Sequence, residues 1–330
     1  MKKILILLLL LAVGLLAFAD DALVLPKGVL RTYVTGAYGF VKSAFDPDGN
    51  KVDAADVLPA PIYQGYKLFN LGGALEYGVT DWMSAAVQWA PGWNVWSEFD
   101  DPLAPILDDN ARANGPFDIF AGAKIQVLGE KGLVTNDTIR VAFAPGVKIG
   151  IPYPDWQKQA DNKVAGDPWI VKSVDKHAWG LGARAYFDYV LNKMFYFNLY
   201  SEFIYYLKTD VDNSDLWSTV PPLLVVAEVE YGYDLTLEAE PHFEMMLGDG
   251  LRLGIGVPAT LTMNPEEKRD GTAVADSDSY LFSVGPNISM FLIGFVIPME
   301  FKVGYTLPLM GKNVDAVNTV VVQLKTYLKF

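Results

Sequence analysis

Cysteine is absent from this 330-residue sequence, and histidine occurs only twice, as His177 and His242. Without cysteine, neither a disulfide bond nor a lipid-bearing cysteine anchor can form. A catalytic histidine needs an activated Ser or paired Asp residues beside it, and the sequence identifies no such Ser for His177 near Asp175. His242 lacks the partner spacing of a metal site. The sequence therefore predicts no enzymatic activity, no cofactor and no metal site.

Positive charge and long apolar runs are also scarce. Lys and Arg number 26 against 39 Asp and Glu, so the formal net charge is −13 and nucleic acid is not an expected partner. Hydrophobic residues make up 51% of the chain, yet beyond Phe18 no apolar run of transmembrane-helix length continues without Gly, Pro or a charge. A transmembrane β-barrel reconciles these facts, because each spanning strand needs only about 9 to 11 residues and only every second residue must be apolar.

The amino terminus has the pattern of an export signal. Lys2 and Lys3 precede an apolar run from Ile4 to Phe18, and Ala17-Phe18-Ala19 matches the small-x-small site that signal peptidase reads. A membrane anchor needs roughly 20 apolar residues, and this run is shorter. We expect residues 1–19 to be a cleaved signal peptide and residues 20–330 to form one domain. The nine residues from 20 to 28, ahead of the first predicted strand, are too few for a folded plug.

Alternating segments separated by turns predict an all-β fold, an antiparallel up-and-down barrel of about twelve strands, with ten or fourteen as alternatives. Short turns alternate with long loops rich in Asp, Pro and Asn, which is typical of transmembrane barrels. The predicted strands are Val29–Val41, Gly65–Tyr77, Trp82–Ala90, Phe117–Leu128, Thr138–Gly150, His177–Val190, Met194–Leu207, Val229–Leu247, Leu251–Met263, Ser279–Phe291, Phe295–Leu307 and Asn318–Phe330.

Five prolines lie in or beside the predicted strands. Because proline has no N–H group to donate to a ladder, each one predicts a bulge or a strand end. They are Pro145, Pro241, Pro258, Pro286 and Pro298.

The last predicted strand shows the alternation most clearly. Mostly apolar residues from Val320 to Phe330 occupy one face, and mixed polar residues from Thr319 to Lys329 occupy the other. A terminal strand that ends on Phe330 resembles the closing strand and assembly signal of bacterial outer-membrane β-barrels. The resemblance implies a place in the outer membrane of a diderm bacterium, contact with its lipid, and recognition of this strand by the barrel-assembly machinery.

The predicted strand Val229–Leu247 carries an unusual acidic face. Charges on the lipid side are costly, so this face is expected to line the lumen. The strand has 19 residues, which exceeds the span of a bilayer, so its first residues are expected to stand above the membrane. The expected lumen-lining carboxylates are Glu230, Asp234, Glu238, Glu240 and Glu244, and the expected lumen-lining basic residues are Lys124, Arg140, Arg184, Arg252 and Lys302. Two interpretations stay open: the opposite charges brace one another, or the carboxylates favour the passage of cations.

Three short motifs extend the resemblance. They are the turn Glu76-Tyr77-Gly78-Val79-Thr80-Asp81-Trp82, the strand start Leu251-Arg252-Leu253-Gly254-Ile255-Gly256 and the closing segment Val320–Phe330. Together they resemble the transporters of hydrophobic compounds that include the long-chain fatty-acid channel family and the phenol-degradation-pathway barrels. That fatty-acid family usually has fourteen strands and an amino-terminal plug, and this chain departs from both features.

The functional expectation follows from the residues. A barrel with charged inward faces predicts an outer-membrane channel that passes small solutes by diffusion, with a preference for cations. The resemblance implies an alternative, the uptake of a hydrophobic small molecule such as a fatty acid. A surface adhesin or structural barrel, whose loops act instead of its lumen, is the third hypothesis.

Overall fold

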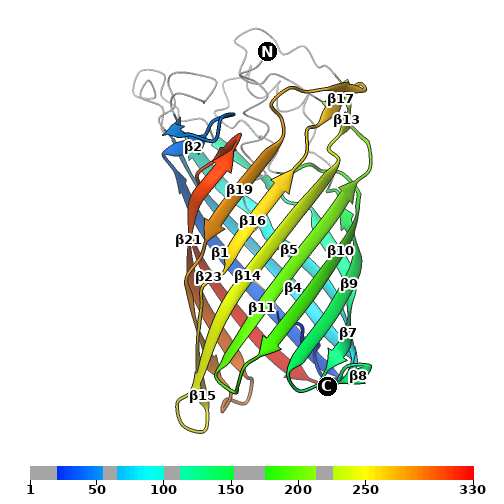
Figure 1. Cartoon of the computed structure of the whole chain (residues 1–330), viewed down its shortest axis with the longest axis vertical. Coiled ribbons are helices and arrows are strands. Elements are labelled where there is room, and N and C mark those ends of the chain that lie inside the picture. The colour runs from blue at the N-terminus through cyan, green and yellow to red at the C-terminus, as the bar shows by residue number, and fades with distance from the viewer. Residues whose placement is uncertain (1–20, 55–64, 100–111, 152–174, 213–225) are drawn as a thin grey trace.

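A computed structural model describes residues 21–54, 65–99, 112–151, 175–212 and 226–330. The described residues form a closed antiparallel barrel of twelve spans (Figure 1). Single strands make ten of them: β1 (Val29–Val41), β4 (Tyr66–Thr80), β5 (Met83–Phe99), β7 (Ile119–Gly129), β9 (Ile139–Ile149), β10 (Gly180–Val190), β11 (Phe195–Tyr206), β14 (Tyr233–Met246), β21 (Met299–Lys312) and β23 (Asn318–Lys329). The other two are interrupted, β15 (Leu251–Gly256) continuing as β16 (Ala259–Asn264), and β19 (Ser279–Val284) as β20 (Asn287–Leu292).

The first strand closes the barrel against the last. β1 pairs with β23 in an unbroken register, from Val29 opposite Lys329 to Phe40 opposite Asn318. Closure leaves the barrel sheet without a free edge, so the backbone groups of every span find partners on neighbouring strands. The fold class predicted from the alternation is confirmed.

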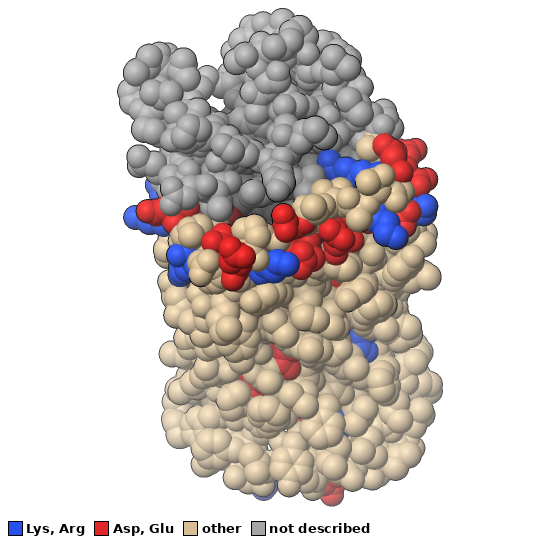
Figure 2. All heavy atoms as spheres, turned by 45° about the horizontal axis from the view of Figure 1, so that its top comes forward, with Lys and Arg blue, Asp and Glu red and all other residues tan. Residues whose placement is uncertain are grey.

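The barrel wall is apolar outside and mixed inside. In β23, Val320, Val322 and Leu324 are exposed, whereas Val321 and Gln323 are buried. Figure 2 shows a wall with few charges, while Lys, Arg, Asp and Glu gather near one end of the barrel. An exposed apolar belt of this extent is unfavourable in water and suits hydrocarbon. Among the described residues, no helix has the length and hydropathy required to cross a membrane.

The predicted strands overlap the observed spans and differ mainly at their ends. β5 runs to Phe99, beyond the predicted end at Ala90, and pairs there with β6 (Arg112–Pro116), so the predicted loop from Pro91 to Pro116 is wrong at both ends, and its middle, 100–111, lies outside the described residues. The β4–β5 register shifts in this region, and Gly92 adopts a φ of +94°. The irregularity lets the strand continue past Pro91.

Three of the five prolines interrupt strands as predicted. Pro258 separates β15 from β16, and Pro286 separates β19 from β20. Pro298 immediately precedes β21. Proline therefore divides two of the spans without breaking the barrel.

The remaining two prolines lie inside continuous strands. Pro145 of β9 faces Ala183, and Pro241 of β14 faces Phe197, both in regular register. The prediction of a bulge or strand end is wrong at these two positions. On the other side of Pro241, the neighbouring ladder is already interrupted between β15 and β16, where the N–H of Val257 donates to the Pro241 carbonyl at 3.3 Å. A missing donor is tolerated beside such a gap.

The long predicted strand Val229–Leu247 is two strands. Gly232 has a φ of +74°, a conformation that favours glycine, and it separates β13 (Val226–Glu230) from β14. β13 joins a small sheet at the end of the barrel that Figure 1 draws at the top, and a second small sheet lies at the same end. The first sheet contains β12 (Thr209–Asp212), β13, β17 (Lys268–Arg269) and β18 (Thr272–Ala273), and the second contains β2 (Ser43–Phe45), β3 (Lys51–Asp53) and β22 (Val314–Asp315).

The described residues before β1 are 21–28, and they begin inside the barrel. Ala22 is fully buried among the inward side chains of Ala142, Ala144, Tyr186 and Tyr200. At the β1 end of this segment, the N–H of Gly28 donates to Gly78 O at 2.9 Å. The sequence indicates too few residues for a folded plug, and the structure places Ala22, near the start of the described residues, in the lumen.

Candidate functional site

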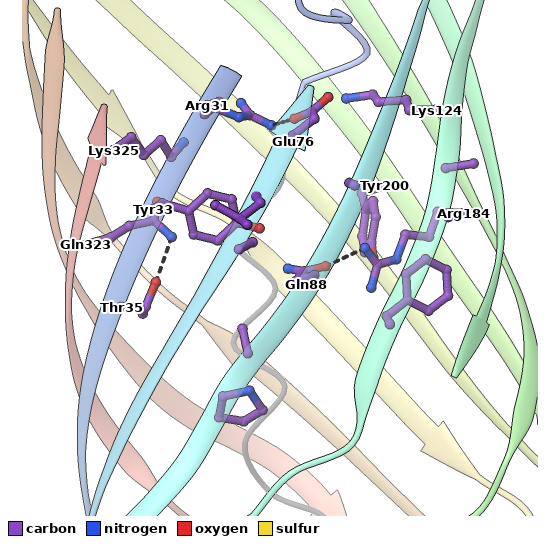
Figure 3. A pocket seen from close by; sticks show the side chains of 18 of the residues that line it. Arg31, Tyr33, Thr35, Glu76, Gln88, Lys124, Arg184, Tyr200, Gln323 and Lys325 are labelled. Carbon is purple, nitrogen blue, oxygen red and sulfur yellow. Dashed lines mark hydrogen bonds and ion pairs between the residues drawn. The ribbon is translucent and has the colours of Figure 1, made fainter. Parts of the chain in front are cut away.

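The lumen contains a small chamber of about 90 Å³, shown in Figure 3. Among the described residues that line it, four are basic and one is a carboxylate. The basic residues are Arg31, Lys124, Arg184 and Lys325, and the carboxylate is Glu76. Aromatic and amide side chains complete the wall: Tyr33, Phe120, Tyr186, Tyr200, Gln88 and Gln323. The chamber is therefore basic, although the chain as a whole is strongly acidic.

Neighbouring residues hold Arg184 of β10 in a fixed orientation. Its Nε donates to Glu202 of β11, and its Nη1 donates to the neutral amide oxygen of Gln88. The guanidinium carbon lies 3.8 Å from the centre of the Phe120 ring. The Tyr200 hydroxyl donates to the same carboxylate oxygen of Glu202 at 3.1 Å. A carboxylate on one edge and a ring on one face fix a planar guanidinium without covering all of it.

Arg31 of β1 is paired with Glu76, which lies directly opposite it on β4. Both side chains are buried, and the Ser84 hydroxyl donates to the other oxygen of Glu76. Lys325 of β23 approaches Glu300 of β21 at 3.7 Å. The registers of adjacent strands thus place each of these cations beside a carboxylate on the next strand.

The amino-terminal segment borders the chamber. The N–H of Ala22 donates to both oxygens of Asp188, at 3.1 and 3.0 Å. Lys124 donates to the carbonyl oxygen of Asp21, and its ammonium lies 4.1 Å from the centre of the Tyr186 ring. Arg140 approaches Asp188 at 3.8 Å. The segment is therefore held by a carboxylate and an ammonium of the inner wall.

The acidic face of β14 is buried and bonded to neighbouring strands. Glu238 and Glu240 are 3% and 1% exposed. Glu238 accepts from the Thr260 hydroxyl at 2.8 Å, and Glu240 accepts from the Asn287 amide at 3.1 Å while lying 3.3 Å from His242 Nδ1. These short contacts support the bracing interpretation of this face.

Glu244 and Asp234 of β14 pair with cations. Glu244 accepts from Arg252 Nη1 at 3.0 Å and from the Tyr196 hydroxyl at 3.0 Å. Asp234 accepts from Lys176 and from the Tyr206 hydroxyl, the latter at 2.7 Å. Opposite charges from different parts of the chain meet here as the bracing interpretation expects.

Two further residues expected to line the lumen lie apart from the chamber lining. Glu230 is in β13 and contacts Lys208 at 2.7 Å in the small rim sheet. The hydrogen bond from Lys208 lowers the pKa of Glu230, and the same bond raises the pKa of Lys208. Lys302 of β21 is buried opposite Gln323 of β23.

Of the ten residues expected to line the lumen, Lys124 and Arg184 belong to the chamber lining. Arg31 and Glu76 also belong to the lining and were not expected there, although the inward parity of their strands contains the signal. The second histidine, His177, has its Nδ1 2.6 Å from the Ile151 carbonyl. Among the described residues, no group of three His, Asp or Glu side chains is arranged to hold a metal ion.

Comparison with known proteins places the fold. No family model matches the sequence, and no curated protein matches it. Among solved structures, the chain is similar to an outer membrane channel from Pseudomonas putida F1, with a TM-score of 0.62 and 14% identity over 94% of this chain and 99% of that chain. The two chains share a fold. The toluene transporter TodX from P. putida is more distant, with a TM-score of 0.43 and 8% identity over 93% of this chain and 91% of that one.

Proposed function

We propose that this chain is an outer-membrane channel that passes small solutes by diffusion through its lumen. The observation that carries the proposal is a closed barrel with an apolar exterior and a charged, partly hollow interior. A bilayer requires the first property, and a polar solute requires the second. The likeness to the P. putida outer membrane channel supports the same function at the level of the fold.

The route to the membrane is part of this proposal. Residues 1–19 act as a cleaved signal peptide, and residues 20–330 form the single barrel domain. The barrel-assembly machinery recognises the strand that ends at Phe330. In the structure that strand is β23, which closes the barrel against β1. The strand that closes the barrel is thus the strand that carries the proposed assembly signal. Recognition of that signal before closure is consistent with this position.

A preference for cations is the finer part of the proposal. The carboxylates Glu238, Glu240 and Glu244 of β14 contribute negative potential to the lumen even where they are braced, because hydrogen bonding does not remove their charge. The basic chamber acts in the opposite direction. We expect the acidic face to dominate, in line with the negative charge of the whole chain.

Planar-bilayer recording of the purified protein tests the function. We expect steady single-channel conductance, and under a salt gradient a reversal potential of the sign that indicates cations. A barrel that is correctly folded, as judged by heat-modifiable migration and β-rich circular dichroism, and yet remains silent would contradict a diffusion channel. Conductance with a reversal potential of the anion sign would contradict only the cation preference.

The alternative of hydrophobic uptake requires an apolar pocket that opens through the wall. An apolar groove does lie on the outer face, where Phe143, Phe187 and Leu237 stand beside the smaller Ala185 and Ser201. However, β10 and β11 pair without interruption beneath it, from Gly180 opposite Tyr206 to Val190 opposite Tyr196. A continuous ladder closes the wall between these two strands. The geometry therefore favours passage along the lumen.

A further inference from the structure

The four basic residues of the chamber come from strands on two sides of the lumen. Arg31 and Lys325 lie on the adjacent strands β1 and β23, and Lys124 and Arg184 lie on β7 and β10. Figure 3 shows the first pair on one side of the chamber and the second pair on the other. A solute in the chamber therefore has cations on both sides. Such an arrangement concentrates anions, because low-dielectric walls focus the field of fixed charges.

The partner of one cation favours an anionic oxygen as ligand. Arg184 donates from its Nη1 to the amide oxygen of Gln88, which is a neutral acceptor. This bond joins a charged donor to a neutral acceptor, and a carboxylate oxygen in place of the amide oxygen gives the guanidinium an acceptor of opposite charge. An incoming carboxylate is thus able to compete for this donor.

The shape of the site restricts the class of ligand further. A guanidinium presents paired N–H groups that match the two oxygens of a carboxylate, and the ring of Phe120 and the bond to Glu202 keep Arg184 in one orientation. The space of about 90 Å³ is smaller than the roughly 150 Å³ cavity known to hold benzene. The chamber therefore suits a carboxylate with a short aliphatic tail.

We infer that the chamber is a binding site for short-chain organic carboxylates, held between Arg184 and Lys124 on one side and Arg31 and Lys325 on the other. The inference rests on the proposed channel function only for the way the solute reaches the site. A carboxylate that passes through the lumen binds briefly and saturably at such a site, although the rest of the lumen favours cations.

Calorimetric titration of the full, exported protein in detergent tests the inference, with propionate as the probe. Propionamide, which has nearly the same shape and no charge, is the matched control ligand. We expect propionate to bind at least tenfold more tightly than propionamide, and benzoate to bind more weakly than propionate because its ring exceeds the space. Equal binding of propionate and propionamide would overturn the inference. Displacement of propionate by an equal concentration of chloride would also overturn it, since the site would then be a general anion site.

Two variants locate the site. Arg184→Gln is expected to weaken propionate binding at least tenfold, whereas Arg252→Gln, which changes an inward arginine outside the chamber lining, leaves it unchanged. Gln88→Glu keeps Arg184 and places a carboxylate of the chain beside its Nη1, so it is expected to abolish binding in a protein that still folds. Unchanged binding in the folded Gln88→Glu protein would overturn the assignment to this chamber.

Bilayer recording separates this inference from the channel proposal. A protein that binds propionate in detergent and conducts no current would contradict the channel and leave the carboxylate site standing. A protein that conducts but gives no propionate heat and no propionate-dependent change in current would contradict the site alone.

Discussion

The lumen has two charged walls with different surroundings. On the acidic wall, Glu238 and Glu240 of β14 are buried and bonded to Thr260 on the neighbouring span and to Asn287 on the span beyond it. On the basic wall, Arg184 and its neighbouring cations border a void. Both walls arise from the same period of two along a strand. Alternation therefore predicts which face of the sheet a charged side chain takes. The side chains opposite it determine whether that charge is bonded to a neighbouring residue or borders space for a solute.

The largest expected effect comes from breaking the buried ion pair of the basic wall. Glu76→Ala leaves Arg31 buried beside an empty position, and removal of one partner of such a pair costs about 3 to 5 kcal/mol of folding free energy. Urea unfolding in detergent, followed by heat-modifiable migration, measures the loss. The double variant Arg31→Met with Glu76→Met removes both charges and is expected to recover most of the stability. A loss below about 1 kcal/mol in Glu76→Ala would show that solvent reaches the pair.

The next largest effect is expected from the amino-terminal segment that contains Ala22. Ala22→Pro removes the N–H that donates to both oxygens of Asp188, a charge-assisted contribution of about 1.5 to 3 kcal/mol. We expect the released fraction of the segment to rise about tenfold or more, with larger and more variable single-channel conductance. Ala22→Gly keeps the N–H and is the control. Equal conductance in the two variants would mean that the segment does not narrow the path.

Smaller, opposite shifts are expected when each wall loses charge. Replacing Glu238, Glu240 and Glu244 together by Gln should lower the cation-to-anion permeability ratio, and Arg184→Gln should raise it, each by about twofold, on the order of 0.4 kcal/mol. The reversal potential under a salt gradient measures both. Shifts in the same direction would contradict the division of the lumen into two walls. An unchanged ratio in the triple Gln variant would leave the acidic wall with bracing alone.

The barrel could be predicted from the sequence because its signal is repeated in every span. Alternation, turn residues and the closing strand at Phe330 each indicate the same architecture, so an error at one strand end does not alter the count. The errors fall where one residue decides the backbone. The alternating acidic residues predict one long strand, which Gly232 divides into β13 and β14. Gly92 lets β5 continue past Pro91. The hydrophobic pattern of a sequence does not indicate which glycines adopt a positive φ.

The chamber could be predicted only in part. Inward parity identifies Lys124 and Arg184, and the same parity applies to Arg31 and Glu76. The pairing of Arg184 with Glu202 depends on the register between β10 and β11, which the sequence of one strand does not contain. The position of Ala22 in the lumen depends on Asp188, a residue far along the chain. Long-range contacts of this kind require the three-dimensional structure.

The smallest expected effect lies outside both walls and sharpens the contrast between buried and exposed pairs. The hydrogen bond from Lys208 lowers the pKa of Glu230 below its ordinary value of 4.5, and the bond to Glu230 raises the pKa of Lys208 above 10.5. A carboxyl whose folded pKa is lowered adds stability that is present above its unfolded pKa and is lost as the pH falls through the lower, folded value. The protection of the β12–β13 amides against hydrogen exchange, relative to the intrinsic exchange rate at each pH, should therefore fall below about pH 4.5, while that of the β14 amides is retained. Glu230→Gln should abolish this acid dependence, and 1 M salt should weaken it, because an exposed pair is screened and a buried one is not.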